Sequence, residues 1–173
     1  METTNYTANE LFSKFNVKCD ENTDEELFVH IMNGNFNKDI DENTDPNILF
    51  NIGKYYNIIE KDYNMMKKYY MMAIEKGNVD TMFNLALYYE DIEKDYDMMK
   101  KYYTMAIEKG NKNAMYNLGH YYMNIEKDHD MMKKYYTMAS EKGHIKAIKN
   151  LANYYMNMSK KYHSNKTCPF CRQ

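Results

Sequence analysis

One segment of this chain occurs three times at a constant spacing. It runs from Glu60 to Gly77, and nearly the same residues return at 93–110 and 126–143, so that the closing glycines are 33 residues apart. A second pattern, Asn-x-x-x-Tyr-Tyr, begins at residues 51, 84, 117 and 150 and keeps the same step. A fixed period of about 20–50 residues is the signature of stacked repeats. Such arrays present long surfaces, so this repeat favours binding over catalysis.

Composition narrows the class of protein further. The 173 residues include 23 basic and 25 acidic side chains, for a net charge of −2, which provides no basic surface for nucleic acid. Hydrophobic residues make up 44% of the chain and tyrosines number 19, which is too apolar and too aromatic for a disordered protein. We therefore expect a folded array with no nucleic-acid partner.

The three cysteines and the N-terminus indicate a compartment. Cys19, Cys168 and Cys171 are too few to form a disulfide framework and favour a reducing environment. No signal peptide is visible, and no run of about 18 apolar residues predicts a membrane span. The expected location is the cytoplasm, without membrane association.

The repeat reads as two helices per unit. Apolar residues at helical spacing predict a first helix, helix A, over 46–58, 79–91, 112–124 and 145–158. A second helix, helix B, is predicted over 61–76, 94–109 and 127–142, starting near an aspartate cap and ending at a glycine cap. Residues 1–45 are expected to form an atypical helical cap, and residues 159–173 a tail.

Small residues at fixed places mark where helices should approach closely. On helix B these are alanines, and on helix A they alternate between glycine and alanine: Ala73, Ala106, Ala139, Gly53, Ala86, Gly119 and Ala152. A large side chain at any of them should overpack the interface, at a cost of about 1–3 kcal/mol.

These residues resemble the Sel1-like repeat, a relative of the tetratricopeptide repeat. The family pattern is Ala-x-x-x-Leu-Gly-x-x-Tyr, a Gly-rich loop, then Asp-x-x-x-Ala-x-x-Trp-Tyr-x-x-Ala-Ala-x-x-Gly. The first half is matched by Ala114, Leu118, Gly119 and Tyr122, and the second by Asp128, Tyr135, Tyr136, Ala139 and Gly143. Tyr135 stands in the Trp place, and Ser140 stands in the place of the second Ala.

The resemblance covers about residues 46–158 and implies a fold. The implied fold is an all-α, right-handed α-solenoid of antiparallel helix pairs that serves as an adaptor or scaffold, and no reaction is implied. One departure is the shorter connection at 123–127, which lacks glycine and accounts for the 33-residue step. This short Tyr-, Met- and Asn-rich version resembles repeats encoded by giant DNA viruses of amoebae, which would place the protein in the host cytoplasm.

Comparing the repeats with one another locates a candidate binding surface. Positions fixed between units are expected to pack, whereas positions that drift are free or tuned to a partner. The drifting positions of helix A lie at i, i+4 and i+7 and therefore share one face. In tetratricopeptide-like arrays helix A lines the concave groove, so the resemblance places this face there. The predicted partner-binding residues are Phe50, Lys54, Phe83, Leu87, Glu90, Tyr116, His120, Met123, Lys149 and Asn153.

Two interpretations of that face stay open. An apolar centre with a polar rim suits a peptide or partner helix, but simple drift on a solvent-exposed face would look similar. The fixed asparagines at 51, 84, 117 and 150 adjoin the strip. They could bind a peptide backbone, as in related repeats, or satisfy the neighbouring helix.

The C-terminal Cys168-Pro-Phe-Cys-Arg172 is similar to the last ligand pair of a RING-type zinc module. Structural zinc needs four ligands, and His163 together with either Cys19 or another chain could complete a set with Cys168 and Cys171. The motif is either a partial zinc site, or a vestige of a lost module or a mobile tail. No catalytic arrangement or phosphate loop is readable, so we expect a non-enzyme without cofactor. The alternative function is the substrate-recruiting arm of a zinc-dependent ubiquitin-ligase assembly.

Overall fold

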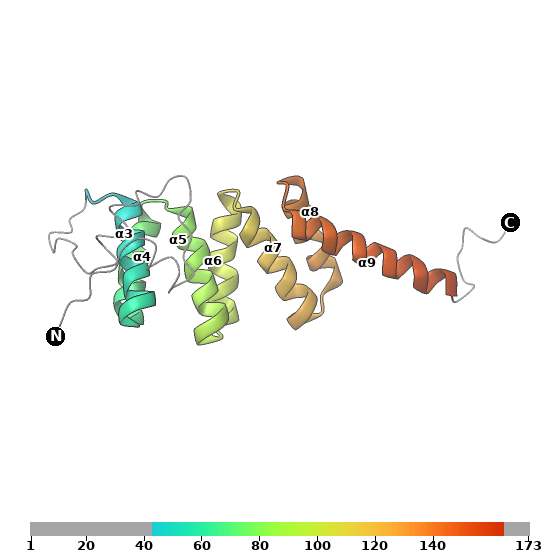
Figure 1. Cartoon of the computed structure of the whole chain (residues 1–173), viewed down its shortest axis with the longest axis horizontal. Helices are drawn as coiled ribbons and strands as arrows, with labels where there is room; N and C mark the ends of the chain where they lie inside the picture. Colours follow the sequence, from blue (N-terminus) through green and yellow to red (C-terminus); the bar gives the residue numbers. More distant parts are fainter. Residues whose placement is uncertain (1–42, 165–173) are drawn as a thin grey trace. The chain divides into compact units, whose positions relative to one another are not determined.

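The computed structural model describes residues 43–164, with side chains to residue 161, and this part is helical without β-strands. It divides into two compact units after Leu85, within α5. The helices are α3 (Pro46–Tyr55), α4 (Tyr63–Glu75), α5 (Val79–Tyr88), α6 (Tyr96–Glu108), α7 (Lys112–Tyr121), α8 (His129–Glu141) and α9 (Ile145–Ser164) (Figure 1). The predicted cap at 1–45 lies almost wholly outside the described residues.

Each of the first three A helices ends in a π-helical turn. These turns are η1 (Tyr56–Glu60), η2 (Tyr89–Glu93) and η3 (Tyr122–Glu126). Each is followed by a lysine in the left-handed region: Lys61 at φ 57°, Lys94 at φ 56° and Lys127 at φ 58°. The sequence predicted that the third helix A ends at 124, with a short glycine-free connection at 123–127. The chain instead continues as wider helix and reverses at a single lysine.

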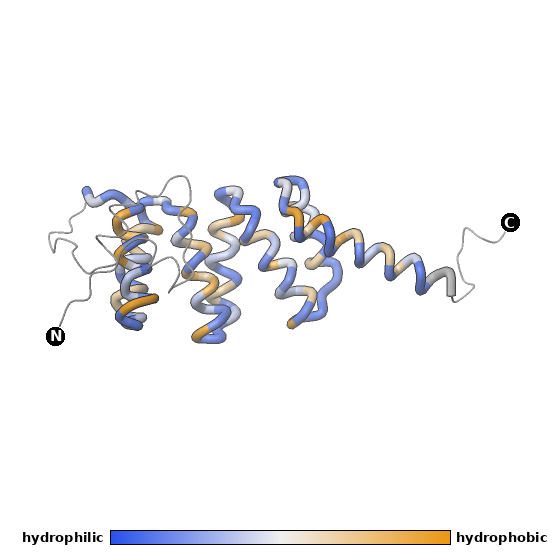
Figure 2. Tube along the Cα trace, viewed as in Figure 1, coloured by the Kyte–Doolittle hydropathy of each residue, from blue (hydrophilic) through white to orange (hydrophobic). Residues whose placement is uncertain are grey.

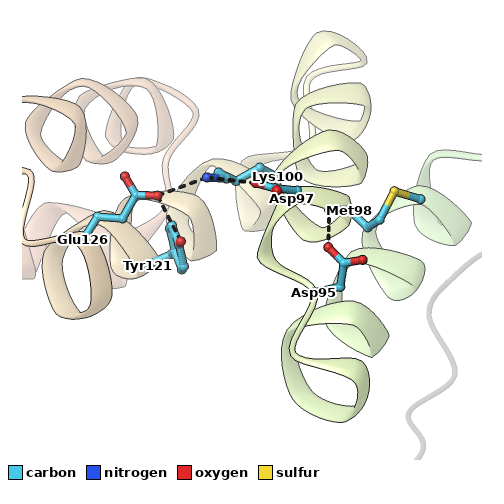
Figure 3. A network of polar contacts seen from close by, with 6 residues as sticks. All are labelled: Asp95, Asp97, Met98, Lys100, Tyr121 and Glu126. Atoms are coloured by element: carbon cyan, nitrogen blue, oxygen red, sulfur yellow. Dashed lines mark hydrogen bonds and ion pairs between the residues drawn. The ribbon is translucent and has the colours of Figure 1, made fainter.

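A tyrosine–glutamate hydrogen bond closes each π-helical turn. In η3 the Tyr121 hydroxyl donates to Glu126 Oε1 over 2.9 Å, and Lys100 Nζ reaches the same oxygen over 3.1 Å (Figure 3). Tyr55 and Tyr88 make the equivalent bonds to Glu60 and Glu93. Burial and the hydrogen bond to the carboxylate raise the pKa of Tyr121 to about 12.

The B helices begin and end as the sequence predicts. Asp95 caps α6 by accepting the Met98 N–H over 3.0 Å (Figure 3), which satisfies a donor that the first turn leaves unpaired. At the other end Gly110 has φ 86° and donates its N–H to the Ile107 carbonyl. This is a Schellman-type stop, where only glycine avoids a left-handed penalty. Asp62 and Asp128, and Gly77 and Gly143, repeat both devices.

Within each repeat, helix A packs on helix B through tyrosines and small residues. In the second unit the core joins Met115 of α7 to Met132, Tyr136 and Ala139 of α8. A Cβ on Gly119 would lie 2.7 Å from Tyr136 Cδ1, so the small residue permits the approach. In each repeat a pair of tyrosine rings stacks across this interface, with centroids 5.5–5.6 Å apart. The pairs are Tyr56–Tyr69, Tyr89–Tyr102 and Tyr122–Tyr135. The apolar residues lie along the helices, while the connections between helices are mostly hydrophilic (Figure 2).

α9 departs from the repeat and from the prediction. It continues unbroken to Ser164 (Figure 1), so the expected helix end at 158 and the tail boundary at 159 were wrong. Ser159 and Lys161 stand where the earlier repeats have the turn glutamate and the capping aspartate. Without those acceptors neither the closing bond nor the next cap can form. Ala152 is exposed, so its predicted role in close packing was also wrong.

Candidate functional site

The second unit contains a pocket of about 370 Å³ between the α7–η3 arm and α9. Its lining is mostly apolar, with a row of side-chain amides. The lining residues are His120, Met123, Asn124, Asn150, Asn153, Tyr154, Asn157, Met158 and Lys161.

The amide row follows from helical geometry. Asn150, Asn153 and Asn157 are spaced three and four residues apart on α9, so they share one face. α9 can present all three because it remains helical past the point where earlier repeats turn. The missing π-helical turn therefore creates one wall of the pocket.

Internal hydrogen bonds hold three of the lining side chains, Asn150, Met123 and Asn124. The Tyr136 hydroxyl accepts from Asn150 Nδ2 over 3.2 Å and donates to Met123 Sδ over 3.7 Å. Asn124 Nδ2 donates to the His120 carbonyl over 3.0 Å. These contacts position the pocket side chains before any partner arrives, which lowers the entropic cost of binding.

The chemistry of the lining suits recognition. An asparagine side chain offers two N–H donors and a carbonyl acceptor, the same groups that a peptide backbone requires. Met123, Met158 and Tyr154 provide apolar contact, and Lys161 adds a cation. The nine lining residues include no Ser, Cys, Asp or Glu, so the lining has no serine or cysteine nucleophile and no carboxylate for acid–base chemistry.

The structure brings together three of the predicted site residues. His120, Met123 and Asn153 line the pocket. Tyr116 is instead packed against His144 and Tyr136, with ring centroids 4.4 and 5.6 Å away. Tyr116 therefore contributes to the packing of α7 on its neighbours, and its replacement by alanine should cost stability.

The other predicted residues have separate surroundings. Glu90 accepts a 2.5 Å hydrogen bond from the Tyr103 hydroxyl, and Lys149 is exposed on α9. In the first unit the Phe50 ring stacks on Tyr70, with Lys54 Nζ 5.1 Å from the Phe50 centroid. Phe83 and Leu87 are half-buried on α5. A single strip through all ten positions stays a prediction.

The fixed asparagines serve the protein's own tyrosines in the second unit. Asn117 Nδ2 donates to the Tyr103 hydroxyl over 3.0 Å, and Asn150 Nδ2 donates to Tyr136. Two interpretations were left open for these positions, and both Asn117 and Asn150 fit the second, in which the asparagine satisfies a neighbouring helix. Asn150 also lines the pocket, so one amide contributes to packing and to the site.

Sequence comparison missed several pocket residues, including Tyr154, Asn157 and Met158. Asn157 and Met158 were assigned to the last turn of the fourth helix A, directly before the predicted tail at 159–173. Their only signal was the loss of the glutamate and aspartate at 159 and 161, which predicts that the helix continues.

The zinc hypothesis rests on residues that the structure does not describe. Cys168 and Cys171 lie outside the described residues, and so does the side chain of His163. Across residues 43–161 no three His, Cys, Asp or Glu side chains gather as a metal site. None of the helices described here is long and apolar enough to cross a membrane.

Comparison with known proteins identifies the fold. No protein-family model matches the chain, and no curated protein matches it. A crystal structure of a protective antigen present in uropathogenic Escherichia coli strains, which displays an SLR fold, aligns with 84% of the chain at a TM-score of 0.58 and 22% identity. The chain has a Sel1-like repeat fold. The aligned region is 31% of that antigen's length. A Sel1 repeat protein from Oxalobacter formigenes aligns with 78% of the chain and 55% of its own length, at a TM-score of 0.48 and 23% identity.

Proposed function

We propose that this Sel1-like repeat chain is a non-catalytic interaction module that holds a peptide segment of a partner protein in the α7–α9 pocket. The row of amides at Asn150, Asn153 and Asn157 carries the proposal, because such a row can pair with consecutive backbone groups of a bound chain. Met123 and Met158 would receive an apolar side chain of that segment. The lining has no carboxylate and no serine or cysteine nucleophile, which supports binding without chemistry.

The volume of the pocket agrees with a short segment. A space of about 370 Å³ lies near the lower end of the range of about 300–1,000 Å³ typical of ligand pockets. It would hold one or two side chains with their backbone, and the rest of the segment would run along the helices. Orientation by the Tyr136 hydroxyl network would let a small contact bind specifically.

A displayed library of random 12-residue peptides tests the proposal directly. We expect selection on the full chain to enrich a peptide family, whose members are then titrated by fluorescence anisotropy. The double variant Met123→Ala/Asn153→Ala should bind at least about tenfold more weakly, a loss of about 1.4 kcal/mol. Ile92→Ala is the matched control, because Ile92 is an exposed apolar residue of the same unit outside the pocket.

The outcome is decisive in both directions. Equal binding by the double variant and the wild type would show that the peptides bind elsewhere. Enrichment of no peptide would contradict a peptide-binding pocket. Circular dichroism of each variant confirms that the fold is retained.

A further inference from the structure

The last A helix carries an exposed apolar face. Ile148 is 44% exposed and Tyr155 is 54% exposed, and Ala152 between them is also exposed. The three residues are spaced four and three apart, so they form one stripe along α9. This stripe is separate from the amide row of the pocket.

The same stripe is covered in the earlier repeats. The corresponding residues are Met115 and Gly119 of α7 and Tyr122 of η3, and Met115 is only 4% exposed. α8 covers them: Met132 clusters with Met115, Tyr136 lies over Gly119, and Tyr135 stacks on Tyr122 with centroids 5.6 Å apart. The stripe on α9 is therefore the A side of an A–B interface whose B side is absent from the described residues.

The first unit shows the same recognition pattern. Here the stripe is Leu49 and Gly53 of α3 and Tyr56 of η1. α4 covers it with the adjacent tyrosines Tyr69 and Tyr70. The chemistry of the covering helix is thus defined by the repeats themselves. It presents two adjacent tyrosines, a methionine one turn earlier and an alanine one turn later.

The described chain has no spare helix for this stripe. α9 continues to Ser164 without reversing, and α8 already packs on both α7 and α9. Charge distinguishes the possible occupants. Residues 145–164 include four lysines, Lys146, Lys149, Lys160 and Lys161, and no Asp or Glu. A second copy of α9 would bring like charges together, whereas a helix with acidic flanks would be attracted.

We propose that the Ile148–Ala152–Tyr155 stripe is a docking surface for a helix of a separate protein, with the tyrosine-pair pattern of helix B and acidic flanks. The partner's first tyrosine stacks on Tyr155, its second lies over Ala152, and its methionine contacts Ile148. The partner helix then extends the repeat array across a molecular boundary. This surface is independent of the peptide pocket, so either site can fail without the other.

A peptide copy of one of the chain's own B helices can test binding to the stripe. A peptide with the sequence of residues 94–109, cross-linked to remain helical and carrying a fluorophore, reproduces helix B with four lysines against three acidic residues, a net charge of +1. Cross-linking is needed because an isolated helix of about this length is marginal in water. A second probe has both lysines at 100 and 101 replaced by glutamate, and a third has both tyrosines replaced by alanine. Each is titrated against the full chain by fluorescence anisotropy.

The expected result is saturable binding of the first probe, tighter binding of the acidic probe and none of the tyrosine-free probe. Ile148→Asp should weaken binding at least about tenfold. Ile145→Asp is the matched control: it makes the same charge change on α9, but its counterpart Lys112 is exposed on α7. Equal losses in the two variants, or no binding of the first two probes, would overturn the proposal.

Sedimentation velocity of the full chain tests the competing occupant. A monomer over the concentration range of the titration agrees with a separate partner. A dimer that Ile148→Asp dissociates and Ile145→Asp does not would overturn the proposal, because the stripe would then belong to a second copy.

Discussion

Replacing Tyr70 by phenylalanine should stabilise the protein. The Tyr70 hydroxyl is fully buried and has no hydrogen-bond partner among the described residues. At the same place in the next repeat, the Tyr103 hydroxyl donates to Glu90 and accepts from Asn117. In the first repeat the position of Glu90 is held by Asn57, and Asn84 instead donates to its own helix at the Asp80 carbonyl. Tyr70 thus keeps a polar atom that its surroundings do not satisfy.

The magnitude follows from the cost of that atom. A buried hydroxyl without a partner costs about 1–3 kcal/mol relative to water. Phenylalanine keeps the ring, its stacking on Phe50 with centroids 5.8 Å apart and its place over Gly53. We therefore expect Tyr70→Phe to raise the free energy of unfolding by about 1–2 kcal/mol. Tyr103→Phe should lower it by about 1–3 kcal/mol, because two partners lose their hydrogen bonds.

Urea denaturation followed by far-UV circular dichroism measures both changes. A gain of about 1 kcal/mol corresponds to about 2–4 °C in Tm for a chain of this size, so thermal melts provide a second reading. The opposite signs of the two variants are the essential result. Destabilisation by Tyr70→Phe comparable to that by Tyr103→Phe would refute the reasoning, since it would show that the Tyr70 hydroxyl has a stabilising partner.

Three further predictions concern packing, backbone and pH. Gly119→Leu should destabilise by about 1–3 kcal/mol through overpacking, whereas Ala152→Leu should change stability by less than about 0.5 kcal/mol because Ala152 is exposed; equal losses in urea melts would contradict the α9 geometry. Lys94→Gly should stabilise the protein by up to about 1 kcal/mol, because glycine removes the strain of a side chain in the left-handed region. Lys101→Gly inside α6 should instead destabilise the protein by about 1 kcal/mol. Calorimetry measures whether Tm rises in the first variant and falls in the second. Tyr121 has a pKa of about 12 in the folded protein and about 10 in the unfolded chain, so its contribution to the free energy of unfolding is complete below pH 10 and is lost as the pH rises to 12. Tyr121→Phe should therefore flatten the dependence of stability on pH between 10 and 12, measured by urea denaturation. An unchanged slope would refute this prediction.

The caps of helix B could be predicted because each depends on one residue with one physical role. Glycine, as at Gly110, is the residue type that adopts the left-handed φ of this helix end without strain. Aspartate, as at Asp95, is a common side-chain acceptor at the start of a helix. The π-helical turns could not be predicted in the same way. A lysine at φ 56° looks like any surface lysine, and the tyrosine–glutamate bond spans five residues, outside the usual helical spacings.

The candidate site was partly predictable for a related reason. Drift between repeats selected His120, Met123 and Asn153, which line the pocket, and also Tyr116, which packs internally. The place of Tyr116 is aromatic in three of four repeats, and Phe50 also stacks on a helix B tyrosine. Such conservative drift indicates packing, whereas changes of chemical class, as at His120, indicate a free surface.

The Glu126 carboxylate accepts hydrogen bonds from two different repeats, and this affects how the array unfolds. Tyr121 reaches it from the same repeat, and Lys100 reaches it from helix B of the preceding repeat (Figure 3). Opening the turn therefore breaks a bond on each side of the repeat boundary, which makes neighbouring repeats unfold together. At the last boundary Ser159 replaces the glutamate, and Lys133 pairs with Asp130 on its own helix. α9 lacks this shared bond, so it is the part of the described chain that can fray while its neighbours stay folded, leaving the end of the array free to open one helix at a time.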